Sequence, residues 1–288
     1  MRSLSNRTKG IICILAAAFG FALMTAFVRA AGDVPVMQKS FFRNLVAMFI
    51  ASIALVRSGI GFKIEKSYRL DIFFRCLFGT SGVIANFYAI GKLGIADANM
   101  LNKLAPFFAI VLSIPLLKEV PSKVDAISTL IAFIGALFII RPTGVVAETI
   151  PAIIAVYGGF GAGTAYVFVR RASKKGAETP TIVFAFSTFS CLVTLPFIVF
   201  DYHPMTKWQL ISLLMAGVSA SLGQFSITSA YRFAPAKDLS VFDYTQVIFA
   251  ALIGIVAFSE TPVLLSIIGY VIIIGVSVVR WLKRNEEK

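Results

Sequence analysis

The sequence is poor in charge, histidine and cysteine. Charged residues make up 14% of 288, whereas a soluble domain carries roughly 25%. A composition this apolar argues against a soluble enzyme or binding module. One histidine, His203, and three cysteines without a C-x-x-C pair support neither a zinc site nor a disulfide framework.

Catalytic and nucleotide-binding signatures are also missing. No H-E-x-x-H motif occurs, and the glycine-rich run 158–163 lacks the G-K-[ST] ending of a phosphate-binding loop. Because this run lies inside an apolar stretch, we interpret Gly159 and Gly163 as a G-x-x-x-G helix-contact surface. The sequence predicts no enzyme and no cofactor.

Acidic residues are fewer than basic ones, which gives a net charge of +13. In a soluble protein this excess would suggest nucleic acid. Here the basic residues form short clusters between apolar runs, which is how membrane proteins fix their orientation. No basic face interleaved with aromatic residues is present. We therefore expect a lipid bilayer as partner, and no nucleic acid.

What the sequence has in abundance is long apolar runs. A bilayer core is about 30 Å thick and needs about 20 helical residues to cross. Continuous runs differ from the alternating pattern of a membrane β-barrel. They predict an all-α membrane protein with ten transmembrane helices, at approximately 10–31, 36–57, 70–91, 96–117, 123–141, 149–170, 180–200, 208–231, 237–258 and 262–282.

One pattern occurs twice, at a constant shift of 141 residues. It joins Asp97 to Asp238, Glu119 to Glu260 and Pro121 to Pro262, and further pairs are Gly20/Gly161, Gly82/Gly223 and Arg29/Arg170. The sequence therefore predicts two units, 1–145 and 146–288. Because each unit would hold five helices, an odd number, the second must be inverted in the membrane.

The basic residues also predict orientation. With the N-terminus in the cytoplasm, 20 lysines and arginines fall on that side and five on the other. This bias places both termini in the cytoplasm. Glu119 is then expected to face the cytoplasm and Glu260 the outside. The expected location is a cell membrane, the plasma or inner membrane of a prokaryote.

Several motifs resemble the EamA family of the drug/metabolite transporter superfamily. They are Arg75 with the following F-G-T-S-G, the L-x-x-L-A-P around Pro106, and the endings K-E-V-P and S-E-T-P; Arg43 in F-F-R-N also fits. The resemblance covers nearly the whole chain. It implies ten helices in two inverted repeats and transport of metabolites, amino acids, amines or drugs, and it leaves the substrate open.

Polar residues inside the expected spans are the candidate substrate-binding residues. In the fourth span, positions from Asn99 to Ser113 repeat every three or four residues and form one small, polar face. Pro106 removes a donor and should free the carbonyl of Asn102. Close helix packing is the alternative role for this face. The candidates are Arg43, Asn86, Tyr88, Asn99, Asn102, Lys103, Gln224, Asp243, Tyr244 and Gln246.

Two of these charges suggest the solute. If their helices are straight, Lys103 and Asp243 lie about 8–9 Å deep from opposite faces, roughly 12 Å apart. A small zwitterion or organic anion would fit between them, with its carboxylate toward Lys103 and Arg43. The alternative is that Lys103 extends outward and Asp243 pairs with a neighbouring helix. For Arg43, a side chain that extends outward to the membrane surface is as good an interpretation as a role in binding the solute.

The sequence thus favours a secondary transporter of a small polar or amphiphilic metabolite, working by alternating access at a central cavity. Its partners would be a small-molecule substrate and the bilayer. Coupling to a proton, for which Asp243 is the candidate carrier, or to a counter-substrate stays open. Two alternatives also remain: a lipid or lysolipid flippase or scramblase, and a multidrug or amine exporter.

Overall fold

The structure is a computed structural model that describes residues 5–93, 101–140, 149–259 and 264–286. Within these ranges it is entirely helical, as predicted. The helices are α1 Asn6–Ala30, α2 Val36–Ser58, α3 Arg69–Leu93, α5 Ala105–Leu117, α6 Lys123–Ile140, α7 Thr149–Lys174, α8 Thr179–Phe200, α9 Lys207–Phe233, α10 Ala236–Asp243, α11 Thr245–Phe258 and α12 Leu264–Glu286.

The helices have the length and surface of membrane spans. Six helical stretches are long and apolar enough to cross a bilayer. Large apolar side chains such as Phe49, Phe200 and Val256 point outward, which suits contact with lipid. The predicted span 237–258 is divided into α10 and α11. The predicted boundary between units, at 145/146, lies outside the described residues.

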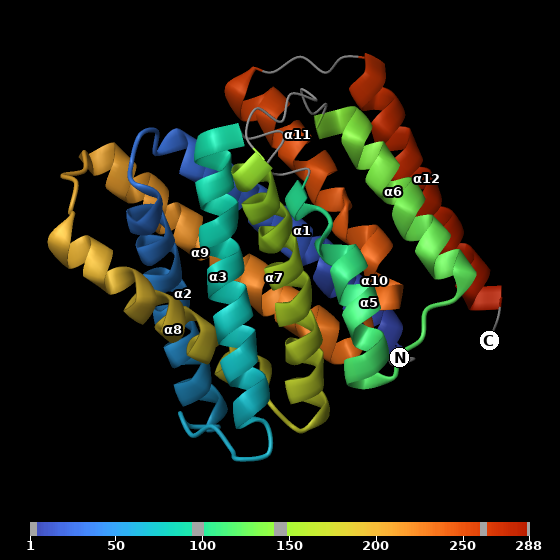
Figure 1. Cartoon of the computed structure of the whole chain (residues 1–288), viewed down its shortest axis with the longest axis horizontal. Coiled ribbons are helices and arrows are strands. Elements are labelled where there is room, and N and C mark those ends of the chain that lie inside the picture. The colour runs from blue at the N-terminus through green and yellow to red at the C-terminus, as the bar shows by residue number, and fades with distance from the viewer. Residues whose placement is uncertain (1–4, 94–100, 141–148, 260–263, 287–288) are drawn as a thin grey trace.

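The helices pack in pairs that correspond at the shift of 141. Helix α1 packs on α9, and α7 packs on α3 in the corresponding arrangement; α11 meets α1 as α5 meets α7. Helices α2 and α8 form a further pair, while α6 and α12 lie together along one side of the bundle (Figure 1). Helices of the first half of the chain therefore pack mainly against helices of the second half.

Glycines set the closest of these crossings. A Cβ at Gly20 would lie 2.7 Å from the nitrogen of Gly223, so α1 and α9 touch backbone to backbone. At the corresponding crossing, a Cβ on Gly161 would lie 2.9 Å from the Cα of Gly82. Gly163 likewise faces the backbone of α5. The glycine-rich run is thus a helix-contact surface, which confirms its interpretation from the sequence.

The start of α1 and the end of α12 lie at the same end of the bundle (Figure 1). The guanidinium of Arg7, in α1, donates to the carbonyl of Arg280, in α12, at 3.4 Å. The connections 118–122 and 175–178 reach the same end, where Glu119 forms ion pairs with α7 and Glu178 forms one with Arg232 of α9. We call this end the terminal face.

Candidate functional site

Two helix breaks occur at corresponding positions in the middle of the bundle. Residues 101 and 102 are helical, Lys103 and Leu104 form a turn, and α5 begins at the next residue. In the second copy α10 stops at Asp243 and α11 starts after Tyr244. Lys103 and Tyr244 are separated by the shift of 141. Pro106 accounts for the first break, but valine occupies the matching place in the second.

Each break frees a backbone carbonyl. The N–H of Phe107 donates to Leu104 at 3.0 Å instead of to Lys103. In the second copy the N–H of Val247 donates to Tyr244 at 3.0 Å instead of to Asp243. Inside a membrane protein such carbonyls need other donors. The sequence predicted a free carbonyl at Asn102, because Pro106 has no N–H. The structure also frees the carbonyls of Lys103 and Asp243.

Side chains are exchanged between the two breaks to satisfy these carbonyls. The hydroxyl of Tyr244 donates to the carbonyl of Lys103 at 3.0 Å. In return the Nζ of Lys103 lies 3.5 Å from the carbonyl of Asp243 and donates to Gln246 Oε1 at 2.7 Å. A side chain at each break therefore contacts the backbone carbonyl that is freed at the other break.

Lys103 and Asp243 also form a direct ion pair. Nζ lies 3.5 Å from Oδ2, and both side chains are largely buried. The expected gap between the two charged groups is therefore wrong, as is an outward-extended Lys103. The estimate assumed straight, separate helices, whereas the two breaks face each other. A solute that binds between these charges must separate them.

Arg43 and Arg75 lie inside the bundle, 4% and 2% exposed. Arg43 donates its Nε to the sulfur of Met24 at 3.0 Å, so it does not extend outward. Arg75 donates to Gln224 Oε1 at 3.0 Å. Both arginines and Asp243 are within electrostatic range of Tyr166. We call the following residues the central cluster: Arg43, Arg75, Lys103, Tyr166, Gln224, Asp243, Tyr244 and Gln246.

The other predicted site residues are more scattered. Asn102 lies against Gly158 of α7, and so does the backbone of Asn86, whose buried Oδ1 has no hydrogen-bond partner in the described residues. Tyr88 is 43% exposed. Asn99 lies outside the described residues. The central cluster therefore contains six of the ten candidates, and a role in binding stays a prediction for all of them.

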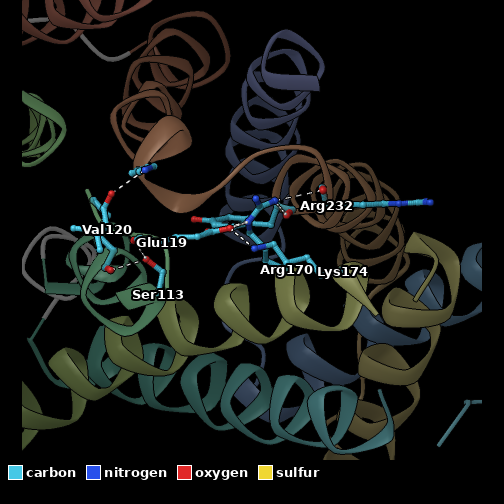
Figure 2. Close-up of polar contacts among 9 residues, drawn as sticks. Ser113, Glu119, Val120, Arg170, Lys174 and Arg232 are labelled. Atoms are coloured by element: carbon cyan, nitrogen blue, oxygen red, sulfur yellow. Dashed lines mark hydrogen bonds and ion pairs between the residues drawn. The ribbon is translucent and has the colours of Figure 1, made fainter. Parts of the chain in front are cut away.

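The terminal face carries a second set of polar contacts, centred on Glu119 (Figure 2). Its carboxylate accepts from Arg170 Nε at 2.7 and 2.9 Å and from Lys174 Nζ at 2.6 Å. Arg170 also donates to the carbonyl of Tyr231 at 3.1 Å. One arginine of α7 thus joins the end of α5 to the end of α9.

The end of α7 is held on another side by Asp71 of α3. Arg171 Nε and Lys175 Nζ lie 2.9 and 2.6 Å from its carboxylate, which is 1% exposed. Sequence reasoning missed this arrangement. Its signal was present: in R-R-A-S-K-K, two pairs of basic residues at i and i+4 occupy neighbouring helix faces.

The motif around Glu119 begins with an unusual backbone. Lys118 has φ 57° and Ser259 has φ 53°, and they are the non-glycine residues with positive φ in the described chain. They are 141 residues apart and end α5 and α11 with left-handed caps. The cap turns Glu119 toward α7. Glu260, its counterpart, lies outside the described residues.

Comparison with known proteins agrees with this architecture. The profile of the EamA-like transporter family matches residues 8–141 and again 149–281. A solved crystal structure superposes with a TM-score of 0.83 at 16% identity, covering 96% of this chain and 98% of that one. At this identity the likeness shows the fold alone.

Curated relatives match over most of their length. The chain is 29% identical to the pseudopaline exporter CntI of Pseudomonas aeruginosa over 92% of this chain and 93% of that protein. It is 25% identical to mouse solute carrier family 35 member G1, over 96% and 80%. An uncharacterized transporter of Helicobacter pylori is 27% identical, over 85% of each chain. With the profile covering nearly every described helix, the chain belongs to the EamA-like transporter family and is a multi-pass membrane transporter.

Proposed function

We propose that the chain is a secondary transporter that moves a small polar metabolite, an amino-acid-like zwitterion or an organic anion, by alternating access around the central cluster. Ten spans in two inverted units, 1–145 and 146–288, would place both termini in the cytoplasm. The membrane would be the plasma or inner membrane of a prokaryote.

The observation that carries this proposal is the ion pair between Lys103 and Asp243 at facing helix breaks. Charges inside a membrane protein are costly and mark substrate or ion pathways. In transporters, broken helices line the site near the bilayer midplane. A zwitterion supplies a carboxylate for the lysine and an ammonium for the aspartate, so it replaces the pair without leaving either charge alone.

The ion pairs of the terminal face support alternating access. They join α7 to α3 and to the end of α5, and Arg170 adds a hydrogen bond to α9; such contacts are expected in a transporter closed toward that face. The proposed cytoplasmic gate is therefore made of Glu119 and Asp71, each held by basic residues of α7. Opening the gate would separate these pairs.

Export is the direction favoured by the Pseudomonas relative, whose name describes an exporter. A protonated Asp243 would release Lys103, so proton coupling fits the pair, as does exchange for a counter-substrate. The lipid flippase and amine exporter remain the alternatives. A site with more cations than acids favours an anion or zwitterion over a plain amine.

The proposal is tested with purified protein in liposomes and a panel of labelled amino acids, organic acids and amines. Saturable uptake of a zwitterion or acid is expected. The Asp243→Asn variant keeps side-chain size but loses the ion pair, and uptake should fall about tenfold or more. Asp201→Asn is the matched control, because Asp201 is 77% exposed and its variant should transport normally.

Three results would contradict this function. They are transport of amines alone, movement of labelled lipid without solute uptake, and an Asp243→Asn variant with full activity. Uptake that does not change with a pH gradient, combined with acceleration by internal substrate, would replace proton coupling with exchange.

A further inference from the structure

The central cluster holds an arginine with no acidic partner. Among the described residues, Arg75 contacts Gln224, a neutral amide, and the ring of Phe186, 4.0 Å from its guanidinium carbon. Its Nε is buried without a hydrogen-bond acceptor there. Arg43 is similar: its Nη1 has no acceptor within the described chain, and its Nε contacts only the sulfur of Met24, a weak acceptor.

Arg75 is nevertheless held in one place. Gln224, from α9, accepts from Nη2, while Phe186, from α8, lies under the guanidinium. Gly79, one turn further along α3, leaves room for the side chain: a Cβ there would collide with Nη1. Three helices thus position a planar cation and leave part of its donor edge unused.

Burial of these arginines is energetically unfavourable unless a bound anion supplies a counter-charge. A buried charge without a counter-charge is strongly unfavourable. An arginine offers two parallel N–H groups that match the two oxygens of a carboxylate. The central cluster has three cations, Arg43, Arg75 and Lys103, against one carboxylate, Asp243, so two positive charges are in excess.

We propose that Arg75, positioned by Gln224, Phe186 and Gly79 and assisted by Arg43, binds a second acidic group of the transported solute. The substrate class is then a compound with at least two carboxylates, one directed to Lys103 and one to Arg75. This inference rests on the proposed transport function and narrows its substrate. It adds Arg75, Phe186 and Gly79 to the candidate binding residues.

The test compares acids with amides of the same shape. Binding of glutamate against glutamine, and of succinate against succinamate, is measured by calorimetry on the purified full chain in detergent. The acid should bind about tenfold tighter in a pair that fits, because one charged hydrogen-bonded contact contributes about 1.5–3 kcal/mol. If no acid binds better than its amide, the subsite is wrong.

The Gln224→Glu variant tests the residue itself. It is isosteric and gives Arg75 a carboxylate within the protein, so it should fold normally and remove the preference for the acid. Gln209→Glu, on the same helix, is the matched control: Gln209 forms a capping box with Thr206, and glutamate serves equally well there. A preference that survives Gln224→Glu would overturn the proposal.

Gly79→Ala provides a second variant in which Arg75 is kept but displaced. The collision involves the flexible end of the arginine, so the helix should form and acid binding should weaken. Transport is then measured separately in liposomes. Uptake without acid preference would overturn the subsite and keep the transporter, whereas acid-selective binding without uptake would keep the subsite and overturn the transport role.

Discussion

At the scale of single residues, the hydroxyl of Tyr244 has a defined structural task. It donates to a carbonyl that the helix break has freed, and its side chain is fully buried. A buried acceptor that loses its donor cannot turn to water. The tyrosine is therefore needed to keep the first break in shape, independently of any solute.

Replacing Tyr244 with phenylalanine should destabilise the protein by about 1–3 kcal/mol, because the carbonyl of Lys103 is left unsatisfied. The measurement is the midpoint of thermal unfolding in detergent. Tyr202→Phe is the control, since Tyr202 is exposed and its variant should unfold as the wild type does. An unchanged midpoint for Tyr244→Phe would show that the carbonyl has another donor.

At the scale of helices, the crossings of α1 with α9 and of α7 with α3 depend on glycine. Gly20→Ala and Gly161→Ala each force a Cβ against backbone that cannot move aside. Each variant should lose about 1–3 kcal/mol of stability through overpacking, and the two losses should be similar because the crossings correspond. The measurement is again thermal unfolding in detergent.

Gly275 is the matched control for these two variants. Nothing lies within 4 Å of a Cβ built there, so Gly275→Ala should be neutral or stabilise α12 by up to about 1 kcal/mol through helix propensity. A loss at Gly20 with none at Gly161 would contradict the correspondence of the two crossings.

Much of the helical arrangement follows from the sequence. Apolar length predicted most spans, and the shift of 141 predicted which glycines correspond. The break at Tyr244 was not predicted, since no proline marks it; it depends on a side chain that arrives from the other copy. The ion pair of Lys103 with Asp243 was not predicted either, because residue counting assumes that each helix continues straight.

The site was predicted only in part for the same reason. Polar residues in apolar runs are visible in a sequence, so Lys103, Asp243, Arg43 and Gln224 were found. The partners of Lys103, Asp243 and Gln224 come from helices more than 100 residues away. Arg75 was noticed as part of a family motif, yet its burial over Phe186 depends on three helices that no local pattern relates.

At the scale of the whole molecule, the contacts of Glu119 and Asp71 connect helices at one end of the bundle. Under the proposed alternating access, they are the candidates for the barrier that opens in each transport cycle. Opening shifts an equilibrium between two arrangements, so loss of a contact found in only one of them changes the populations.

Glu119→Gln should favour the arrangement open at the terminal face by about tenfold, because charged hydrogen bonds to Arg170 and Lys174 are weakened. The reporter is a cysteine at Ser113, which is 1% exposed beside Glu119, in a chain whose three native cysteines are replaced. Its reaction with a maleimide should accelerate. Glu65→Gln is the control, because Glu65 is exposed on the 59–68 connection, and it should leave the rate unchanged.

A maleimide rate that stays the same in Glu119→Gln would mean that the ion pairs do not set the populations. A slower rate would assign Glu119 to the open arrangement instead.

The exchange between the two helix breaks also bears on how such a chain evolves. Lys103 corresponds to Tyr244, Asn102 to Asp243 and Ala105 to Gln246, so the copies now carry different chemistry at matching places. A dimer of two first copies would set lysine against lysine with no carboxylate between them. Two second copies would lack the amine. We therefore expect that neither half can be replaced by a second copy of the other, and that each half constrains mutation in the other.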